Sequence, residues 1–511
     1  MKKIVISTAL VCCCMTLGCA GPERAKAPEG IVTLSEPGSP FVAFNIWVKA
    51  GSQNDPQGKE GLASLTANLL SESSTRQDSY EQILAKLYPM AAGYDYNVDK
   101  EMTAFSGRIH RDNLETYYSL FKNALLSPAF KEEDFKRIKT QTVSYLKQAR
   151  RFSNDEELSK ELLYWQIFKG TPYEHPEEGY VTSVESITLD DVKAFYARYY
   201  TRDNVVVGVG GGYPEDFAAR VRTDFDTLPA GKVAPAQKPS PAAGDGVKIL
   251  IVEKNVISTP ISFGFPIPLQ RSDPDFYAMM LANSWMGEHR TSVSHLYQVI
   301  REKRGMNYGD YSYIEAYPQG YATQVPPTNV CRRSQIFEVW IRPIAATAPG
   351  TLHDRSLFAF RAALREVARL VDNGMTSEAF DTQRGYLKNY YVNFGNTVGR
   401  RLEYRIDDAF YGIPDPGFLA STPQGLDALT LEKVNASIKR HLQSRNMWVV
   451  FITQDAESMK KKLLAGAPTN ITYAGKQPQE VLDEDKIIAA FPIPVKPENI
   501  AIININDVFE K

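Results

Sequence analysis

The strongest constraint in this sequence is a segment that occurs twice. Residues 187–207 align without a gap to residues 429–449, a shift of 242 positions. Within this segment the identical pairs are Thr188/Thr430, Leu189/Leu431, Val192/Val434, Ala194/Ala436, Arg198/Arg440, Asn204/Asn446 and Val207/Val449. The same shift pairs Phe168, Gly170 and Pro172 with Phe410, Gly412 and Pro414. A match this extensive at one spacing predicts two copies of one folding unit.

Both copies are predicted to close with a helix followed by a strand. Thr188 and Thr430 are typical helix caps, each with an acidic residue in the first turn that follows. A short apolar run comes after each helix and predicts a strand. Between the copies, residues 228–246 are rich in Pro, Ala and Gly without apolar periodicity, which predicts an extended linker.

The remaining patterns predict an α+β fold. Strands are expected at 41–51 and 260–267, and long helices at 113–126, 132–150, 352–373 and 377–394. Strands and helices mix without strict alternation, which favours a mostly antiparallel sheet backed by helices in each copy. The tail carries a helix pattern at 478–491 and a last apolar run at 500–509, expected to pack on the second copy.

These patterns divide the chain into six expected parts. They are a signal peptide (1–18), a tether (19–30), a first domain (31–228), a linker (229–247), a second domain (248–465) and a C-terminal extension (466–511).

The N-terminus predicts export. Lys2 and Lys3 precede an apolar run at 4–17, which is too short to cross about 30 Å of hydrocarbon and is typical of a secretory signal. The sequence TLGC resembles a bacterial lipobox with Cys19 as the lipid acceptor, although Thr16 replaces the usual leucine. Lipidation would tether an otherwise soluble protein to a membrane. Ala20 in place of Asp favours the outer membrane, facing the periplasm. An ordinary cleaved signal is the alternative.

Composition narrows the classes of function. The chain has 511 residues, 43% of them hydrophobic, with a formal net charge of −2 and no long basic block, which disfavours nucleic acid as a partner. After loss of the signal, only Cys19 and Cys331 remain. Because a lipidated Cys19 cannot pair, no disulfide is expected.

Several segments carry a resemblance to a known family. They are WVKAGSQNDPQGKEGLASLTANLL (47–70), GTPYEHPEEG (170–179), residues 187–211 and SHLYQVIREKRGMNYGDYS (294–312). From about residue 30 to 465 the chain resembles the insulinase (pitrilysin, mitochondrial processing peptidase) family of zinc peptidases. The resemblance implies two α+β halves that face each other like a clamshell around an extended peptide.

The zinc side of that family pattern is lost. The resemblance implies an inverted motif, His-x-x-Glu-His, on the first helix, with a third ligand about 76 residues later. This chain has Ser64 and Asn68 at the histidine positions, Ala67 at the position of the base and Tyr145 at the third ligand. These side chains cannot replace two imidazoles and a carboxylate on zinc.

The histidines suggest no replacement site. They are His110, His175, His289, His295, His353 and His441, and no two are three or four residues apart. Histidines at that spacing would share one helical face, as a zinc helix requires. No metal is therefore expected on this chain, and any zinc is expected on a partner subunit.

The second-half signature is intact. Its pattern predicts a helix that ends near Gly305, followed by a strand, with Arg301 in the last helical turns and Tyr308 at the strand start. The resemblance implies that this pair faces the zinc side and holds the substrate carbonyl and the oxyanion of the intermediate. A guanidinium and a phenol are suitable donors for such charge. The alternative is that Arg301 forms an ion pair at the surface and Tyr308 packs in the core.

Three functions stay open from the sequence. The first is a subunit that is inactive alone and lends Arg301 and Tyr308 to a zinc-bearing paralogue acting on extended peptides. The second is an inert peptide-binding or scaffold protein of the cell envelope. The third is an active zinc peptidase with non-standard ligands, which would hold about one zinc per chain. A neighbouring gene for a His-x-x-Glu-His paralogue would favour the first.

Overall fold

The computed structural model describes residues 30–511 apart from 235, 242–243, 319–324 and 345–350. The predicted signal segment and Cys19 lie outside the described residues. Within the described part, none of the helices combines the length and apolar character that a membrane crossing needs.

The first half of the chain forms a five-stranded sheet in the order β1-β5-β2-β4-β3. The β1–β5 pair is parallel, and the other pairs are antiparallel. Its strands are β1 (Ile31–Ser35), β2 (Phe41–Val48), β3 (Tyr94–Val98), β4 (Thr103–His110) and β5 (Val205–Gly211). Its helices are α1 (Leu62–Ser71), α2 (Tyr80–Leu87), α3 (Leu114–Leu126), α4 (Glu132–Ser144), α5 (Arg150–Phe152), α6 (Asp155–Ile167), α7 (Val181–Ser186), α8 (Leu189–Tyr199) and α9 (Phe217–Phe225).

The second half forms a six-stranded sheet in the order β11-β6-β10-β7-β9-β8. Its strands are β6 (Val247–Glu253), β7 (Ile261–Ile267), β8 (Asn307–Tyr313), β9 (Gln335–Pro343), β10 (Met447–Thr453) and β11 (Val495–Asn504). Its helices are α10 (Phe276–Gly287), α11 (Thr351–Asn373), α12 (Ser377–Tyr390), α13 (Val398–Tyr411), α14 (Phe418–Asp427), α15 (Leu431–His441), α16 (Ala456–Ala465) and α17 (Gln479–Ala489). Two mixed sheets backed by helices confirm the predicted α+β class.

The sequence repeat is a structural repeat. Helices α8 and α15, and strands β5 and β10, begin and end at positions related by the 242-residue shift. The two predicted caps are also confirmed, because the side chain of Thr188 accepts a hydrogen bond from Asp191 N and that of Thr430 accepts one from Lys433 N. The strands of the two sheets follow the same spatial order, and β11 is an addition at the edge of the second sheet.

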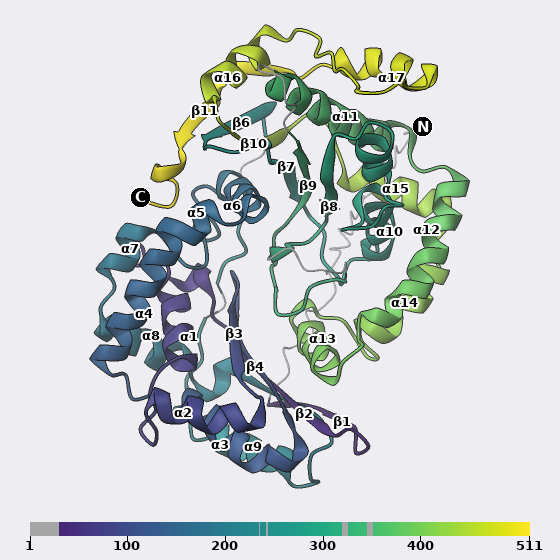
Figure 1. The fold of residues 1–511 in the computed structure, drawn as a ribbon. Helices are drawn as coiled ribbons and strands as arrows, with labels where there is room; N and C mark the ends of the chain where they lie inside the picture. Colours follow the sequence, from purple (N-terminus) through teal and green to yellow (C-terminus); the bar gives the residue numbers. More distant parts are fainter. Residues whose placement is uncertain (1–29, 235, 242–243, 319–324, 345–350) are drawn as a thin grey trace, which may run out of the picture.

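Each half covers the inner face of the other half's sheet with one helix. Helix α6 from the first half packs on β7 and β10, and α13 from the second half packs on β1, β2 and β5 (Figure 1). In β2, Phe44 and Ile46 face the helices of their own half, whereas Trp47 lies with Leu402 and Ile406 of α13. The alternation of side chains along a strand makes both contacts possible.

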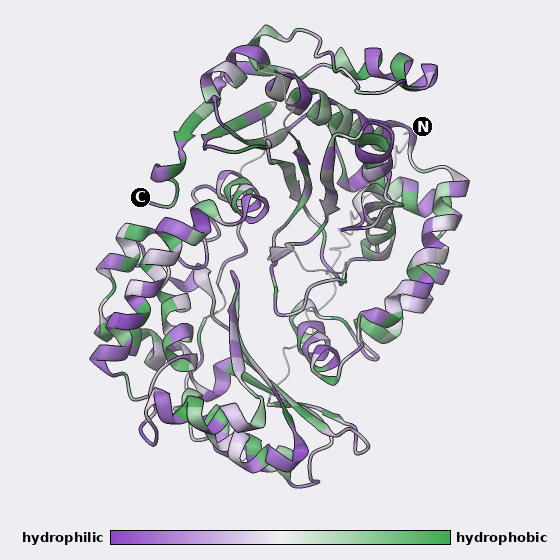
Figure 2. Ribbon diagram, viewed as in Figure 1, coloured by the Kyte–Doolittle hydropathy of each residue, from purple (hydrophilic) through white to green (hydrophobic). Residues whose placement is uncertain are grey.

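The tail joins the second sheet, as expected, and then continues to the first half. Strand β11 pairs in parallel with β6, and both strands are largely hydrophobic in Figure 2. Beyond β11 the backbone carbonyl of Phe509 accepts a hydrogen bond from Val181 N in the first half, at 2.9 Å. The tail therefore contacts both halves, which its apolar pattern alone did not indicate.

Candidate functional site

Helix α1 carries three of the four positions at which the family resemblance implies a zinc site. Its N-cap is Gly61, whose φ of 98° favours glycine, and a Cβ there would lie 2.4 Å from the carbonyl oxygen of Glu178. The carboxylate of Asp55 accepts hydrogen bonds from Gly61 N and Ala63 N, both at 2.7 Å. Burial raises the pKa of Asp55 well above its ordinary value, while these two bonds lower it. Gly61 thus lets the segment around Glu178 approach the helix closely.

The zinc-side positions lie on helix α1 and on the segment that follows α4, and their side chains cannot form a zinc site. Ser64 and Ala67 are buried on α1, and Asn68 Oδ1 has no hydrogen-bond partner among the described residues. Helix α1 packs on α4, and Tyr145 follows α4 directly. An alcohol, a methyl group, an amide and a phenol do not match the imidazole and carboxylate ligands of zinc. Among the described residues, no cluster of three His, Cys, Asp or Glu side chains could hold a metal.

The described chain contains two π-helical segments, η4 (Tyr145–Ala149) and η6 (Tyr297–Glu302). The first begins at the third-ligand position, and the second contains Arg301. In η4 the amide of Arg150 donates to Tyr145 O, and in η6 the amide of Lys303 donates to Gln298 O at 3.1 Å. Single π-helical turns are rare in proteins overall, but those that occur are frequently found at functional sites. Both coincide with positions selected from the sequence.

The structure brings Arg301 close to the start of β8. Segment η6 packs on β8, whose second residue is Tyr308. The Arg301 guanidinium carbon lies 4.7 Å from the centroid of the Tyr297 ring. Burial raises the pKa of Asp310 in β8 to about 8, although Asn307 and the charge of Arg301 lower it. The Arg301 guanidinium and the strand of Tyr308 therefore belong to one local unit.

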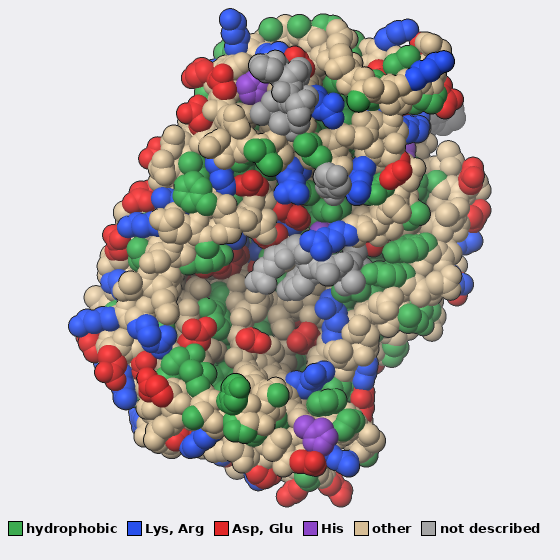
Figure 3. Space-filling model, in the orientation of Figure 1, with side chains coloured by type: hydrophobic (Ala, Val, Ile, Leu, Met, Phe, Trp, Pro, Cys, Tyr) green, Lys and Arg blue, Asp and Glu red, His purple; other side chains and the backbone are tan. Residues whose placement is uncertain are grey.

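A cavity of about 280 Å³ lies between the two halves. Its wall includes Tyr145 from the zinc side, but Arg301 is not among its described lining residues. Figure 3, in the orientation of Figure 1, shows the molecular surface hollowed between the two halves. Both halves contribute charged and aromatic side chains to the lining. They include Tyr145, Arg150, Glu157, Glu161, Tyr164, Glu177 and Glu178 from the first half, and Tyr317, Arg332 and Glu338 from the second.

Several polar atoms on residues that line this cavity are buried and have no hydrogen-bond partner among the described residues. They include Arg150 Nε, Tyr164 Oη, Glu178 Oε2 and Glu338 Oε1. Burial raises the pKa of Glu338 to about 7, against the lowering effect of Lys160. Buried polar groups in native proteins are nearly always paired. Unpaired donors and acceptors on residues around one cavity suit a polar occupant such as a peptide segment or ordered water.

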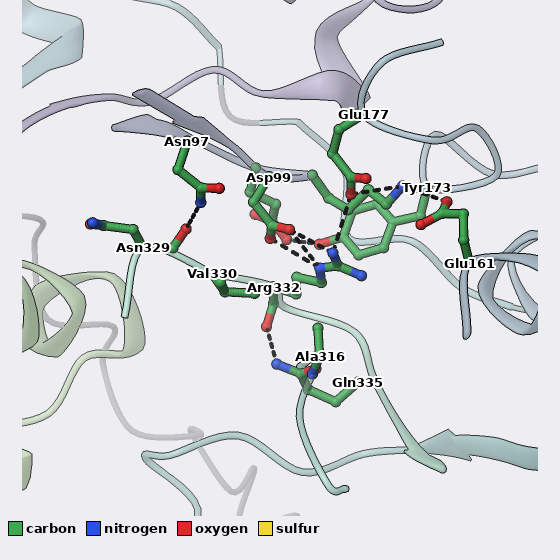
Figure 4. A network of polar contacts seen from close by, with 12 residues as sticks. Asn97, Asp99, Glu161, Tyr173, Glu177, Ala316, Asn329, Val330, Arg332 and Gln335 are labelled. Carbon is green, nitrogen blue, oxygen red and sulfur yellow. Dashed lines mark hydrogen bonds and ion pairs between the residues drawn. The ribbon is translucent and has the colours of Figure 1, made fainter. Parts of the chain in front are cut away.

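A network of buried ions beside the cavity joins the two halves. Arg332, just before β9, donates to both carboxylate oxygens of Asp99 from the first half, at 2.6–3.0 Å (Figure 4). It also pairs with Glu177 at 3.2 Å. Lys100 pairs with Glu177 at 3.0 Å, and its ammonium lies 3.7 Å from Glu161. Burial opposes ionisation of Glu177, but Lys100 and Arg332 outweigh it and lower its pKa to about 2.

Sequence reasoning missed this network. Asp99 and Arg332 are 233 positions apart and belong to no motif. The one local signal is the pair of consecutive arginines that follows Cys331, since Arg333 also crosses to the first half and binds Glu101. Nothing in that pair indicated burial, because arginine is usually exposed.

Comparison with known proteins agrees with the fold. The family profile described as insulinase (peptidase family M16) matches residues 30–179, and the peptidase M16 inactive domain matches residues 186–387. An uncharacterized zinc protease of Streptomyces coelicolor is 25% identical over 326 residues, covering 62% of this chain and 69% of that protein. A Helicobacter pylori protein named non-peptidase homolog YmxG is 20% identical over 424 residues, covering 81% of this chain and 89% of that protein.

A solved structure shares the architecture. The crystal structure of a peptidase M16 inactive domain from Pseudomonas fluorescens covers 84% of this chain and 97% of its own, with a TM-score of 0.71 and 22% identity. The chain belongs to the insulinase family, peptidase family M16. The inactive-domain profile covers residues 186–387, and the first half has Ser64, Ala67 and Asn68 where the family resemblance implies the zinc-binding motif.

Proposed function

We propose that this chain is the non-catalytic subunit of a heteromeric insulinase-family peptidase. A paralogous partner supplies zinc and the general base, and this chain supplies Arg301 and Tyr308. The observation that carries the proposal is the asymmetry of the two half-sites. The zinc side holds Ser64, Ala67, Asn68 and Tyr145, whereas Arg301 keeps a π-helical backbone beside the strand that carries Tyr308.

The cavity between the halves supports peptide binding. The residues around it carry buried polar atoms without a partner among the described residues, with donors on Arg150 and Tyr164 and acceptors on Glu178 and Glu338. An extended peptide presents amide donors and carbonyl acceptors along its whole length, so it can satisfy both kinds. Tyr145 at the cavity wall adds an apolar ring and a polar hydroxyl, which a peptide can contact without a bound metal.

The proposal predicts that peptide hydrolysis requires both proteins. The purified chain alone is expected to hydrolyse no fluorogenic peptide, because it lacks the residues that activate a zinc-bound water. Addition of a His-x-x-Glu-His paralogue from the same genome is expected to produce activity and a stable complex in size-exclusion chromatography. Full activity of the paralogue alone, unchanged by this chain, would favour the scaffold alternative instead. Stoichiometric zinc on this chain with activity alone would favour the third.

We also propose that the protein is lipid-anchored in the cell envelope, at the outer membrane and facing the periplasm. The motivating observation is the lipobox-like sequence that ends at Cys19. Labelling of growing cells with an alkyne fatty acid should mark the wild-type protein, and Cys19→Ala should abolish the label. A Cys19→Ala protein that keeps the label would refute the assignment of this residue.

A further inference from the structure

The last residues of the chain form a strap across the first half. After β11, residues 505–511 lie against α5 and α7, where Figure 1 shows the C-terminus. Val181 N and Thr182 N donate to the carbonyls of Phe509 and Glu510 at 2.9 and 3.3 Å. Val508 and Phe509 are 1% and 5% exposed, so the strap is part of the packed core and not a loose end.

The strap is fastened to α5 by Arg151. Its Nε donates to the carbonyl of Val508 at 2.8 Å, and its guanidinium pairs with Glu510 at 2.7 Å. Arg151 is itself buried, and its carbonyl accepts a hydrogen bond from Lys254 Nζ at 2.7 Å. A buried guanidinium needs these acceptors, because burying a charge without partners is strongly unfavourable.

The neighbouring residue, Arg150, connects the strap to the cavity. The Arg150 guanidinium carbon lies 5.9 Å from the centroid of the Phe509 ring, and one of its nitrogens donates to Glu161 at 3.1 Å. Arg150 lines the cavity, and its amide closes the π-helical turn that begins at Tyr145. Two consecutive arginines thus contact the strap, and one of them also faces the cavity.

We propose that the C-terminal strap holds the cavity wall formed by η4 and α5 in position. Phe509 acts as a positioning residue for Arg150, and through it for the π-helical turn of Tyr145, while Glu510 holds the neighbouring Arg151. Docking of the strap and the conformation of this wall are then coupled, and the coupling is reciprocal. This coupling lies within the chain itself and does not depend on the proposed peptidase partnership.

Hydrogen–deuterium exchange on the full-length protein tests the coupling. Phe509→Ala is expected to raise amide exchange in residues 145–152 about tenfold, since local opening follows the loss of buried contacts. Peptides from α11, distant from the strap, should exchange at the wild-type rate. Phe509→Tyr keeps the aromatic ring and is expected to restore protection. In the reverse direction, Arg150→Met should raise exchange in residues 505–511.

Two further variants separate positioning from general destabilisation. Asp507→Ala changes an exposed residue of the same strap and should leave residues 145–152 unchanged. Glu510→Gln removes the ion pair with Arg151 but keeps the side-chain shape, so it provides a mild variant if Phe509→Ala folds poorly. The proposal is wrong if residues 505–511 lose protection in Phe509→Ala or Glu510→Gln while residues 145–152 keep theirs.

Discussion

Arg301→Ala is expected to lower the turnover of the reconstituted pair by about 10²–10³-fold, the usual loss when one donor to a developing oxyanion is removed. The KM should change much less than kcat, because the guanidinium is proposed to interact most strongly with charge that appears in the transition state. Arg301→Lys should retain part of the rate, since it keeps the charge but loses the planar donor geometry. Tyr308→Phe should also lower kcat by removing only the hydroxyl.

A control variant for Arg301→Ala can be measured in the same reconstituted complex. Arg445→Ala changes an exposed arginine of the same half and should leave both kinetic constants unchanged. Complex formation should be equal for all variants in size-exclusion chromatography, which excludes a loss of the partner as the cause. If Arg301→Ala complexes form normally and keep wild-type turnover, this chain does not supply that donor.

The repeat explains why much of the fold could be predicted. Helix α15 and strand β10 follow α8 and β5 at one constant shift, so a single local pattern predicted both halves. The packing of α6 on the second sheet and of α13 on the first sheet could not be predicted from the sequence. Each helix presents an apolar face, but its partner sheet belongs to the other half, and periodicity carries no information about such a contact.

The candidate site residues were chosen from the sequence, but the backbone around them and their surroundings could not be predicted. The sequence pattern of 132–150 predicts one continuous helix, whereas the structure has a π-helical turn at Tyr145–Ala149. A π-helical turn widens the helix locally and leaves no reliable trace in hydrophobic spacing. The Arg332 network was missed for a different reason. Its members are buried by the approach of two halves, which only the folded chain defines.

Arg332→Ala is expected to lower the free energy of unfolding by about 3–5 kcal/mol, because it leaves a charge buried without its partner. Asp99 is 2% exposed in the folded protein, and its carboxylate binds Arg332 through both oxygens. Its pKa is already raised by burial, against the lowering effect of Arg332, so removal of the guanidinium favours protonation of Asp99. Urea denaturation followed by circular dichroism measures the change as a lower midpoint.

A matched control distinguishes the buried pair from ordinary surface charge. Arg405 pairs with Asp415 at 3.0 Å, but their side chains are 42% and 88% exposed, so Arg405→Ala should change stability by no more than about 1 kcal/mol. Adding Asp99→Asn to Arg332→Ala should recover part of the loss, because a neutral amide is less unfavourable when buried than an unpaired carboxylate. Equal urea midpoints for Arg332→Ala and Arg405→Ala would mean that the network does not hold the two halves together.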